Sequence, residues 1–353
     1  MNQPKELSAL DAKYEAQKIA FAPFTFQACR TLKSLGVLGI ISDSRSNGIS
    51  LENIIVKTGV SEYGSKVLLD MAVCLGVVHL NESGLYTLGK VGYFLLRDKL
   101  TEVNMDFTHD VCYKGLFDLE EAIRNGKPSG LKVFGEWQTI YEALSQLPEQ
   151  VQKSWFDFDH YYSDTSFPEA LPFVFRNKPG HLFDIGGNTG KWTLQCLEHN
   201  EEVQVTILDL PGQLNKAINN IEEKGLSDRV NFHEIDLLSE TKIPTGADAI
   251  WMSQFLDCFS GKEIVSILKR ACASMSEESE LFIMETYWNR QKYPAAEFSL
   301  HATSLYFTCM ANGNSRMYHS DDMKIFVEAA GLKVIEEEDD IGVSHTLFRC
   351  KKA

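Results

Sequence analysis

The sequence lacks the features that mark a membrane-embedded, secreted or polyanion-binding protein. No stretch approaches the roughly 18 consecutive apolar residues of a membrane-spanning helix, and residues 1–6 show no signal-peptide pattern. Basic residues number 34 against 49 acidic ones, and the resulting formal charge of −15 disfavours nucleic acid as a partner. We therefore expect a cytoplasmic protein with no membrane or nucleic-acid partner, which leaves small neutral or weakly charged substrates open.

The spacing of the cysteines gives no indication of a structural metal site. The eight cysteines are scattered, with no Cys-x-x-Cys pair and no His/Cys cluster at zinc spacing. Reduced thiols in the core are expected, and a metal site is not. The 353 residues, 44% of them hydrophobic, are enough for two or three domains.

The most informative segment is 182–190, Leu-Phe-Asp-Ile-Gly-Gly-Asn-Thr-Gly. An apolar strand leads into Asp184 and a glycine-rich turn, which is how a Rossmann-type sheet presents backbone N–H groups and a carboxylate to a nucleoside cofactor. Gly186, Gly187 and Gly190 let the main chain approach a ligand closely, because no Cβ intervenes. We therefore predict that this turn binds a cofactor.

Three later apolar segments also end in polar residues. They are 203–208, followed by Asp209 and Leu210; 230–235, followed by Asp236 and Leu237; and 247–252, followed by Ser253 and Gln254. An acid about one βαβ unit after Asp184 is placed to bond ribose hydroxyls. Because the carboxyl ends of parallel strands meet at one crevice, these residues are expected to line a single site.

The order of the glycines and the nearby acid decide between two cofactors. A nicotinamide dinucleotide needs Gly-x-Gly-x-x-Gly around a pyrophosphate, whereas this turn has Gly-Gly-x-x-Gly, and Asp184 would repel a pyrophosphate. A cationic ligand suits the turn better, and the pattern is similar to that of class I S-adenosylmethionine-dependent methyltransferases. The alternative is a purely structural βα turn, which four successive acidic or polar strand ends disfavour.

The N-terminal part has a winged-helix outline. We predict a helix over 28–40, a second helix capped by Ser50, a third starting at Ser61 or Ser65, and a β-hairpin over 77–88. Such domains usually bind DNA, but basic and acidic residues are nearly balanced here and no Lys/Arg stripe marks a recognition helix. A dimerisation role is therefore favoured over DNA binding.

The rest of the chain predicts an α/β fold: a Rossmann-like seven-stranded sheet completed by a final hairpin of strands 333–336 and 344–350. Before it, 106–175 is expected to be mostly helical and is rich in aromatic residues, which form either core or a wall for a flat substrate. The expected domains are a winged-helix dimerisation domain (1–105), a helical linker that contributes to the substrate pocket (106–175) and a catalytic domain (176–353).

Together these segments resemble the two-domain small-molecule O-methyltransferases of plant phenolic and bacterial polyketide pathways. The specific matches are the winged segment 85–92, the turn 184–190, the strand end 208–211 and the segment 328–332. The resemblance implies a homodimer formed through the N-terminal domains, S-adenosylmethionine as cofactor and S-adenosylhomocysteine as product. It also implies an aromatic small-molecule substrate.

The chain departs from this family where a base is expected. The family usually has Leu-His-Asp-Trp after the fourth strand, and its histidine removes a proton from the substrate hydroxyl. Here Asp257 stands at the histidine's position and Cys258 at the aspartate's. The glutamate that orients the histidine is kept as Glu285, and Ser315 replaces a second flanking acid.

We expect Asp257 to accept the proton, with burial beside Glu285 raising its pKa. His160 or His301 is a further candidate for this step. The main hypothesis is O-methylation of an aromatic or polyketide-like hydroxyl. N- or C-methylation on the same scaffold is the enzymatic alternative, and a ligand-responsive DNA-binding regulator is the alternative of another class.

Overall fold

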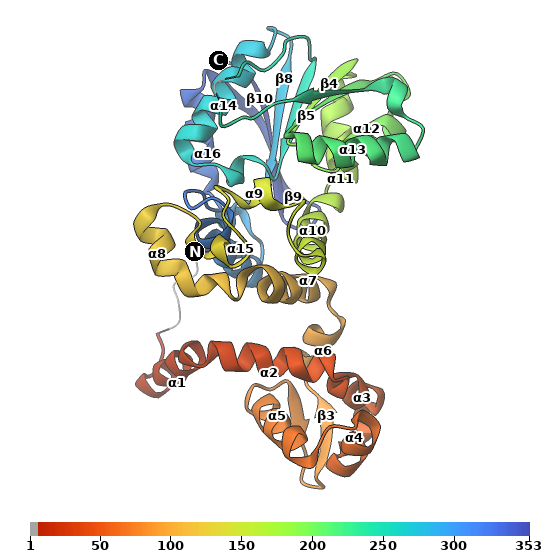
Figure 1. Cartoon of the computed structure of the whole chain (residues 1–353), viewed down its shortest axis with the longest axis vertical. Coiled ribbons are helices and arrows are strands. Elements are labelled where there is room, and N and C mark those ends of the chain that lie inside the picture. Colours follow the sequence, from red (N-terminus) through yellow and green to blue (C-terminus); the bar gives the residue numbers. More distant parts are fainter. Residues whose placement is uncertain (1–5, 240) are drawn as a thin grey trace. The chain divides into compact units, whose positions relative to one another are not determined.

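The computed structural model describes residues 6–239 and 241–353 (Figure 1). They form two compact units: the first ends at Asp106 and the second begins at Phe107. Each unit is described by itself below. No helix among the described residues is long and apolar enough to cross a membrane.

The first unit is a helical domain with a small three-stranded sheet of order β1-β3-β2. Its elements are α1 (Ala9–Ala20), α2 (Ala22–Ser34), α3 (Val37–Asp43), β1 (Ile49–Ser50), α4 (Leu51–Thr58), α5 (Glu62–Cys74), β2 (Val78–Leu80), β3 (Leu85–Leu88), α6 (Lys90–Arg97) and α7 (Lys99–Phe107), the last ending at the boundary. Ser50 and Ser61 cap α4 and α5 by accepting backbone N–H bonds, as their positions before apolar helical segments predict. The winged-helix outline is thus present.

The prediction of one continuous helix over 28–40 is wrong, because two helices cover this range. Gly36 adopts φ +73°, a left-handed conformation that ends α2 and starts α3. The break falls at Gly36 rather than near Gly39, which lies inside α3.

The second unit begins with helices that lead into the large sheet. The helices are α8 (Leu119–Asn125), α9 (Ile140–Ala143), α10 (Glu149–Asp164) and α11 (Phe167–Val174). The alternating part comprises β4 (His181–Ile185), α12 (Lys191–His199), β5 (Gln204–Asp209), α13 (Pro211–Glu223), β6 (Val230–Glu234), β7 (Ala249–Ser253), α14 (Gly261–Ser274), β8 (Glu280–Glu285), α15 (Pro294–Tyr306), α16 (Ser320–Ala329), β9 (Leu332–Ile341) and β10 (His345–Lys352). The helices of 107–175 belong to the same compact unit as the sheet.

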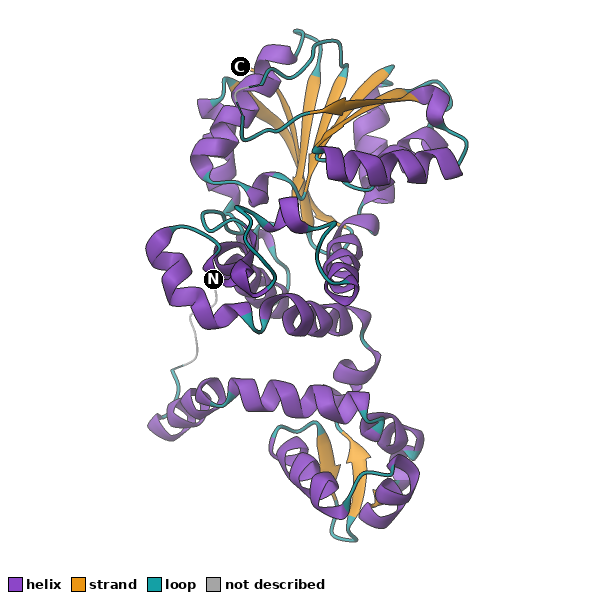
Figure 2. Cartoon of the chain, in the orientation of Figure 1, coloured by secondary structure: helices purple, strands orange, loops and turns teal. Residues whose placement is uncertain are grey.

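The seven strands have the order β6-β5-β4-β7-β8-β10-β9. Strands β6, β5, β4, β7 and β8 pair in parallel, and β10 pairs antiparallel with both β8 and β9 (Figure 2). This confirms the seven-stranded sheet with a terminal hairpin. The acidic stretch before Ile341, expected as a short link, is instead part of β9.

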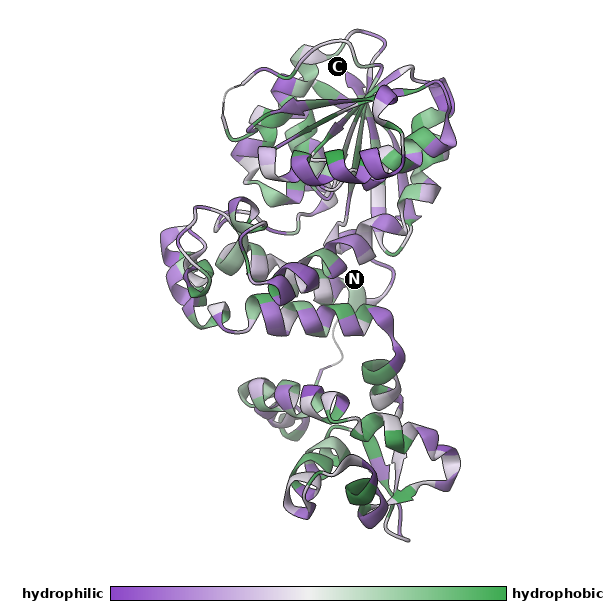
Figure 3. Ribbon diagram, turned by 45° about the vertical axis from the view of Figure 1, so that its right-hand side comes forward, coloured by the Kyte–Doolittle hydropathy of each residue, from purple (hydrophilic) through white to green (hydrophobic). Residues whose placement is uncertain are grey.

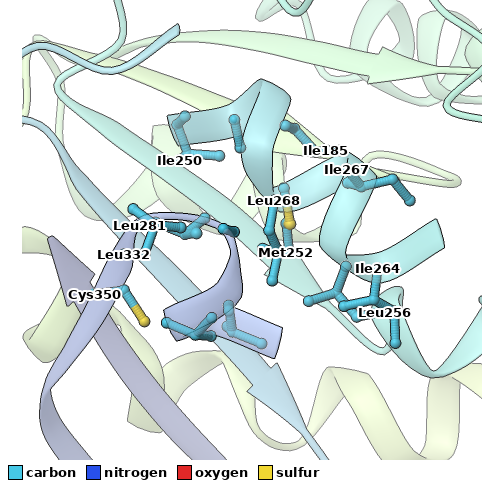
Figure 4. Close-up of a cluster of buried hydrophobic side chains, with 14 of the residues drawn as sticks. Ile185, Ile250, Met252, Leu256, Ile264, Ile267, Leu268, Leu281, Leu332 and Cys350 are labelled. Atoms are coloured by element: carbon cyan, nitrogen blue, oxygen red, sulfur yellow. The ribbon is translucent and has the colours of Figure 1, made fainter. Parts of the chain in front are cut away.

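Successive side chains of the strands point to opposite faces of the sheet, and helices cover both faces. On one face Ile185, Ile250 and Leu281 pack against α14 and α16 (Figure 4); on the other, Val205 and Trp251 pack against α11, α12 and α13. Figure 1 shows α12 and α13 on one side of the sheet and α14 and α16 on the other, and Figure 3 shows apolar strands between helices of mixed hydropathy. Two full layers of helices leave the strand ends as the place where a ligand can enter.

Candidate active site

A cavity of about 550 Å³ opens where β4, β5 and β7 end, and it lies wholly within the second unit. Its walls come from the turn after β4, the residues that follow β5, β6 and β7, and side chains of α10 and α15. Ten residues predicted for the site line this cavity: Asp184, Gly186, Gly187, Asp209, Leu210, Asp236, Leu237, Ser253, Gln254 and Asp257; His160 lines it as well. Strand ends far apart in the sequence therefore meet at one place, as the parallel sheet requires.

The two glycines after β4 leave no room for side chains. A Cβ on Gly186 would lie 2.3 Å from the Phe255 ring, and Gly186 also has φ +73°. A Cβ on Gly187 would lie 2.8 Å from Oδ2 of Asp184 and from Ile207. The turn therefore presents bare backbone to the cavity, and this requires glycine at both positions.

Asp209 fastens this turn to the end of β5. Its Oδ2 accepts the backbone N–H of Asn188 at 2.8 Å, and its Oδ1 accepts the N–H of Leu210 at 2.7 Å. Burial raises the pKa of Asp209 to about 6, although both N–H donors act in the opposite direction. A carboxylate has further lone pairs, so Asp209 can still accept hydroxyl donors from a ligand.

Asp184 lies near the end of β4, just before the turn. Its Oδ2 accepts a hydrogen bond of 2.7 Å from the hydroxyl of Thr193 on α12. Burial raises its pKa to about 7, Thr193 lowers it, and the negative charge of Asp209 raises it further. Neither carboxyl has a basic partner among the hydrogen bonds of the described structure, and a bound cation would therefore stabilise both.

Several buried polar atoms in the cavity wall lack partners in the described part of the chain. They are Oδ1 of Asn188, Oγ1 of Thr189, Nε1 of Trp192, Oγ of Ser253 and the hydroxyl of Tyr141. Buried polar atoms normally have hydrogen-bond partners, so these atoms suit a ligand with both donors and acceptors. With the bare turn and the two acids, the residues fit S-adenosylmethionine, which has ribose hydroxyls, an amino group and a positive sulfonium.

The other half of the cavity is aromatic. The rings of Phe107 and Phe158 stack with centroids 4.0 Å apart, and Tyr306 meets Phe107 edge-on at 4.8 Å. The indole Nε1 of Trp155 donates to the hydroxyl of Tyr306 at 2.8 Å. These side chains form a rigid apolar wall that suits a flat ring system.

Asp257 stands at the junction of this wall with the strand ends. Its side chain is 5% exposed, and its one side-chain hydrogen bond in the described structure comes from the thiol of Cys258, at 3.5 Å. Burial raises the pKa of Asp257 to about 7; the Cys258 thiol lowers it, and the charge of Asp159 raises it.

Glu285 lies behind this position and is fully buried. Its Oε1 accepts the backbone N–H groups of Phe255 and Leu256 at 3.0 and 2.8 Å, and its Oε2 has no hydrogen-bond partner among the described residues. Burial, and then the charge of Asp257, raise its pKa well above the ordinary value. Burial therefore disfavours the ionised form of both carboxyls, and the pKa of Asp257 lies near neutral pH.

His160 lies among other charged side chains of α10. Its Nδ1 is 3.5 Å from Asp164 and 4.0 Å from Asp159, and its ring stacks on Phe156. Asp164 also accepts a 2.5 Å bond from Nζ of Lys191. Burial acts to raise the pKa of Asp164, but the bonds from His160 and Lys191 outweigh it, and the pKa lies below the ordinary value.

Three predicted residues do not line the cavity. His301 is on an exposed face of α15, 53% exposed and 3.8 Å from Glu297. Gly190 adopts φ +78° as the N-terminal cap of α12, which is a structural position, and Glu285 acts from behind the wall. Helical sequence spacing could not show which side of α15 faces the sheet.

Sequence reasoning missed Asp159 as a site residue. Asp159 lines the cavity, accepts a 3.1 Å bond from Nδ2 of Asn188 and has a pKa raised by burial. The available signal was spacing: Trp155, Phe158 and Asp159 follow an i, i+3, i+4 pattern, which places them on one face of α10.

Two family models match the chain. A Dimerisation2-like domain matches residues 13–85, and an O-methyltransferase domain matches residues 116–333. Among curated proteins, the L-tyrosine C(3)-methyltransferase of Streptomyces lavendulae is 23% identical over 275 residues, which cover 77% of this chain and 74% of that protein.

Solved structures share the fold over nearly the whole chain. The S-adenosylmethionine-dependent methyltransferase SibL in its apo form superposes with a TM-score of 0.73 at 22% identity, covering 98% of this chain and 99% of SibL. The O-methyltransferase NcsB1 from neocarzinostatin biosynthesis, in complex with S-adenosylmethionine and 2-hydroxy-5-methyl naphthoic acid, superposes with a TM-score of 0.67 at 18% identity, covering 93% of this chain and 96% of NcsB1.

Proposed function

This chain belongs to the O-methyltransferase domain family of S-adenosylmethionine-dependent enzymes, and on that basis we propose that it methylates a phenolic hydroxyl of an aromatic small molecule in secondary metabolism. One observation supports this assignment best. A carboxyl that ionises near neutral pH, Asp257, lies where an aromatic wall meets the glycine turn in a single cavity.

The cofactor half of the cavity is assigned to the turn after β4 and the residues beyond β5, β6 and β7. S-adenosylmethionine, when bound, supplies an electrophilic methyl group and a positive charge. We assign Asp209 to the ribose hydroxyls, as its free lone pairs and its position after β5 favour. Gly186 and Gly187 provide the close backbone approach, and Asp184 a negative charge.

The proposed task of Asp257 is to accept the phenol proton. An ordinary aspartate with a pKa near 3.9 is a poor base for a phenol near 10, by six units or about 8 kcal/mol. With a pKa of about 7 the difference falls to about three units, or about 4 kcal/mol. The buried position of Asp257 thus removes about half of the pKa gap to a phenol and gives this carboxyl about the basicity of an ordinary histidine.

Glu285 is assigned a positioning role. Through Oε1 it holds the N–H groups of Phe255 and Leu256, which fixes the turn that carries Asp257. A neutral group with the same oxygen can perform this task, so Glu285→Gln is expected to retain most of the activity. Asp257→Asn removes the proton acceptor and is expected to lose it.

The experiment is to incubate the protein with methyl-labelled S-adenosylmethionine and a panel of phenols, and to detect labelled products by mass spectrometry. Calorimetry with S-adenosylhomocysteine tests the cofactor half separately. If S-adenosylhomocysteine fails to bind, the assignment of the cofactor site is wrong. If an acceptor is found and Asp257→Asn turns it over as fast as the wild type, Asp257 is not the base.

Methylation of a ring carbon is the second candidate. The L-tyrosine C(3)-methyltransferase relative modifies a carbon, and removing the proton of a phenol also activates the carbon next to the hydroxyl. The same cavity and the same Asp257 serve either outcome. Product fragmentation decides between them, because a methyl group on oxygen is released by ether cleavage and one on carbon is not.

We also propose a homodimer. The Dimerisation2-like match covers 13–85, and the first unit exposes large apolar side chains, including Leu10, Ile19 and Phe24. Exposed apolar patches of this kind typically form interfaces between subunits. Sedimentation of the full chain gives the mass, and a monomer at micromolar concentration would contradict the proposal.

A further inference from the structure

The cavity wall carries more acidic side chains than those at the strand ends assigned to the cofactor. Among the described residues seven acids line it: Glu142, Asp159, Asp164, Asp184, Asp209, Asp236 and Asp257. The basic side chains that line the cavity in the described chain are Lys191 and His160, and both lie against Asp164. No arginine lines the cavity in the described chain. The wall therefore has no free cation with which to bind an anionic acceptor.

Three of these acids, Asp184, Asp209 and Asp236, follow strands on the cofactor side. Asp159 and Asp257 are different, because they lie against the aromatic wall. Asp159, Asp257 and Tyr306 line the same cavity, and the charge of Asp159 raises the pKa of both other groups. Two carboxylates near each other in a poorly hydrated place repel, and a cation between them relieves that repulsion.

His160 and Lys191 offset the negative charge of Asp159 only in part, because burial outweighs them and the pKa of Asp159 is raised. Its hydrogen bond comes from the neutral amide of Asn188, and His160 is 4.0 Å away and closer to Asp164. Burial raises the pKa of Asp159. Asp257, 5% exposed, accepts a side-chain hydrogen bond from the Cys258 thiol, and within the described part of the chain the buried hydroxyl of Thr189 in the same cavity has no partner. These groups are placed for a ligand with hydrogen-bond donors and positive charge.

The aromatic wall is suited to the same chemistry. The rings of Phe107, Phe158 and Tyr306 line the same cavity as Asp159, and Phe158 precedes Asp159 on α10; ammonium groups bind to aromatic rings of this kind. We propose that the methyl acceptor is a phenol that carries an alkylamino group, whose protonated nitrogen is bound by Asp159 while the phenol ring lies against this wall. This inference rests on the proposed methyltransferase function and names the class of its substrate.

The test uses two series of probes that share a ring and a similar chain and differ in charge. The first is tyramine, N-acetyltyramine and 3-(4-hydroxyphenyl)propionate; the second is serotonin, N-acetylserotonin and 5-hydroxyindole-3-acetate. Binding to the full-length protein saturated with S-adenosylhomocysteine is measured by calorimetry. The ammonium member is expected to bind at least tenfold more tightly than the N-acetyl member, and the carboxylate most weakly.

Asp159→Asn is expected to reduce the preference for the ammonium member at least tenfold. The matched control is Asp157→Asn on the same helix, since Asp157 is half-exposed and paired with Lys153 outside the cavity. It is expected to keep the preference. Thermal unfolding of both variants checks that they are folded.

The inference is overturned by a carboxylate probe that binds as tightly as the amine, by no binding of any member of either series, or by an unchanged preference in Asp159→Asn. If Asp159→Asn instead weakens only S-adenosylhomocysteine, Asp159 belongs to the cofactor site and the inference is wrong. Failure of the proposed function is distinct, because it appears as no binding of S-adenosylhomocysteine by the wild type and no transfer of labelled methyl to any acceptor.

Discussion

Asp209 offers a test in which ligand affinity and stability change in opposite directions. We consider Asp209→Asn, which removes the charge and keeps the shape. The carboxylate has a pKa of about 6 in the folded chain and 3.8 ordinarily, because burial disfavours the ionised form. It is assigned to ribose hydroxyls, and hydrogen bonds to a charged group contribute about 1.5–3 kcal/mol. The variant is therefore expected to bind S-adenosylhomocysteine about 10- to 150-fold more weakly at pH 7.

The pH dependence follows from the same pKa. Ligand binding requires ionised Asp209, so the wild type is expected to bind S-adenosylhomocysteine about tenfold more weakly at pH 5 than at pH 7. The variant has no carboxylate to titrate there. Its affinity should therefore change less over this range, with only Asp184, whose pKa is about 7, contributing.

The free energy of unfolding of the ligand-free protein is expected to fall as pH rises, whereas ligand affinity rises. A carboxyl whose pKa is raised on folding binds more protons in the folded state between the two pKa values, so stability is lost as pH rises from about 4 to about 6. Relative to Asp209→Asn, the wild type should lose about 1.3 kcal/mol of unfolding free energy between pH 5 and pH 7. Urea denaturation of both proteins at each pH measures this difference.

Calorimetry and denaturation together make the reasoning refutable. If wild-type affinity for S-adenosylhomocysteine is the same at pH 5 and pH 7, Asp209 is not a titrating contact. If the variant binds within twofold of the wild type, Asp209 does not hold the cofactor. A stability difference between the two proteins that does not change with pH would mean that burial does not raise the pKa of Asp209.

Three further predictions use other parts of the second unit. Asp257→Asn should lower turnover of an identified phenol about 10²- to 10³-fold, and wild-type kcat/KM should rise with pH to a plateau above about 7, which a pH profile of initial rates measures. Gly187→Ala should abolish S-adenosylhomocysteine binding because its Cβ meets Asp184, whereas Gly212→Ala, with open space around its Cβ, should bind normally in calorimetry. Burial lowers the pKa of His345 to about 4 in the folded chain, so as pH falls below about 6.5 the unfolded chain binds a proton at this position before the folded chain does. The free energy of unfolding of the wild type, relative to that of His345→Gln, should therefore fall by about 2 kcal/mol between pH 7 and pH 5, which urea denaturation measures.

The sequence predicted the parts of the site that depend on local order along the chain. A strand followed at once by Asp184 and glycines, and later strands ending in Asp209 and Asp236, are contiguous patterns whose meaning follows from parallel pairing. The structure brings these ends to one cavity. The terminal hairpin and the helix caps Ser50 and Ser61 were also predicted from residues that are adjacent in the sequence.

Side chains that reach the cavity from helices could not be placed in this way. His301 and Asp159 both lie on helices, and which face of a helix meets the sheet depends on how it docks. His301 lies on an exposed face, whereas Asp159 faces the cavity. The break at Gly36 was missed because a glycine within an apolar helical pattern is compatible with either a continuous helix or a left-handed turn.

The acids of the cavity give the protein a chemical bias that the fold alone does not impose. Each buried carboxyl with a raised pKa destabilises the ligand-free chain at neutral pH, and Asp184, Asp209 and Asp257 all behave in this way. Such a cost is retained where the charge acts on a ligand. Two of the three are explained by a cationic cofactor with ribose hydroxyls. Asp257 is explained only by a group that donates a proton or carries positive charge, and for this reason its position argues for an acceptor with an ionisable hydroxyl and against an anionic one.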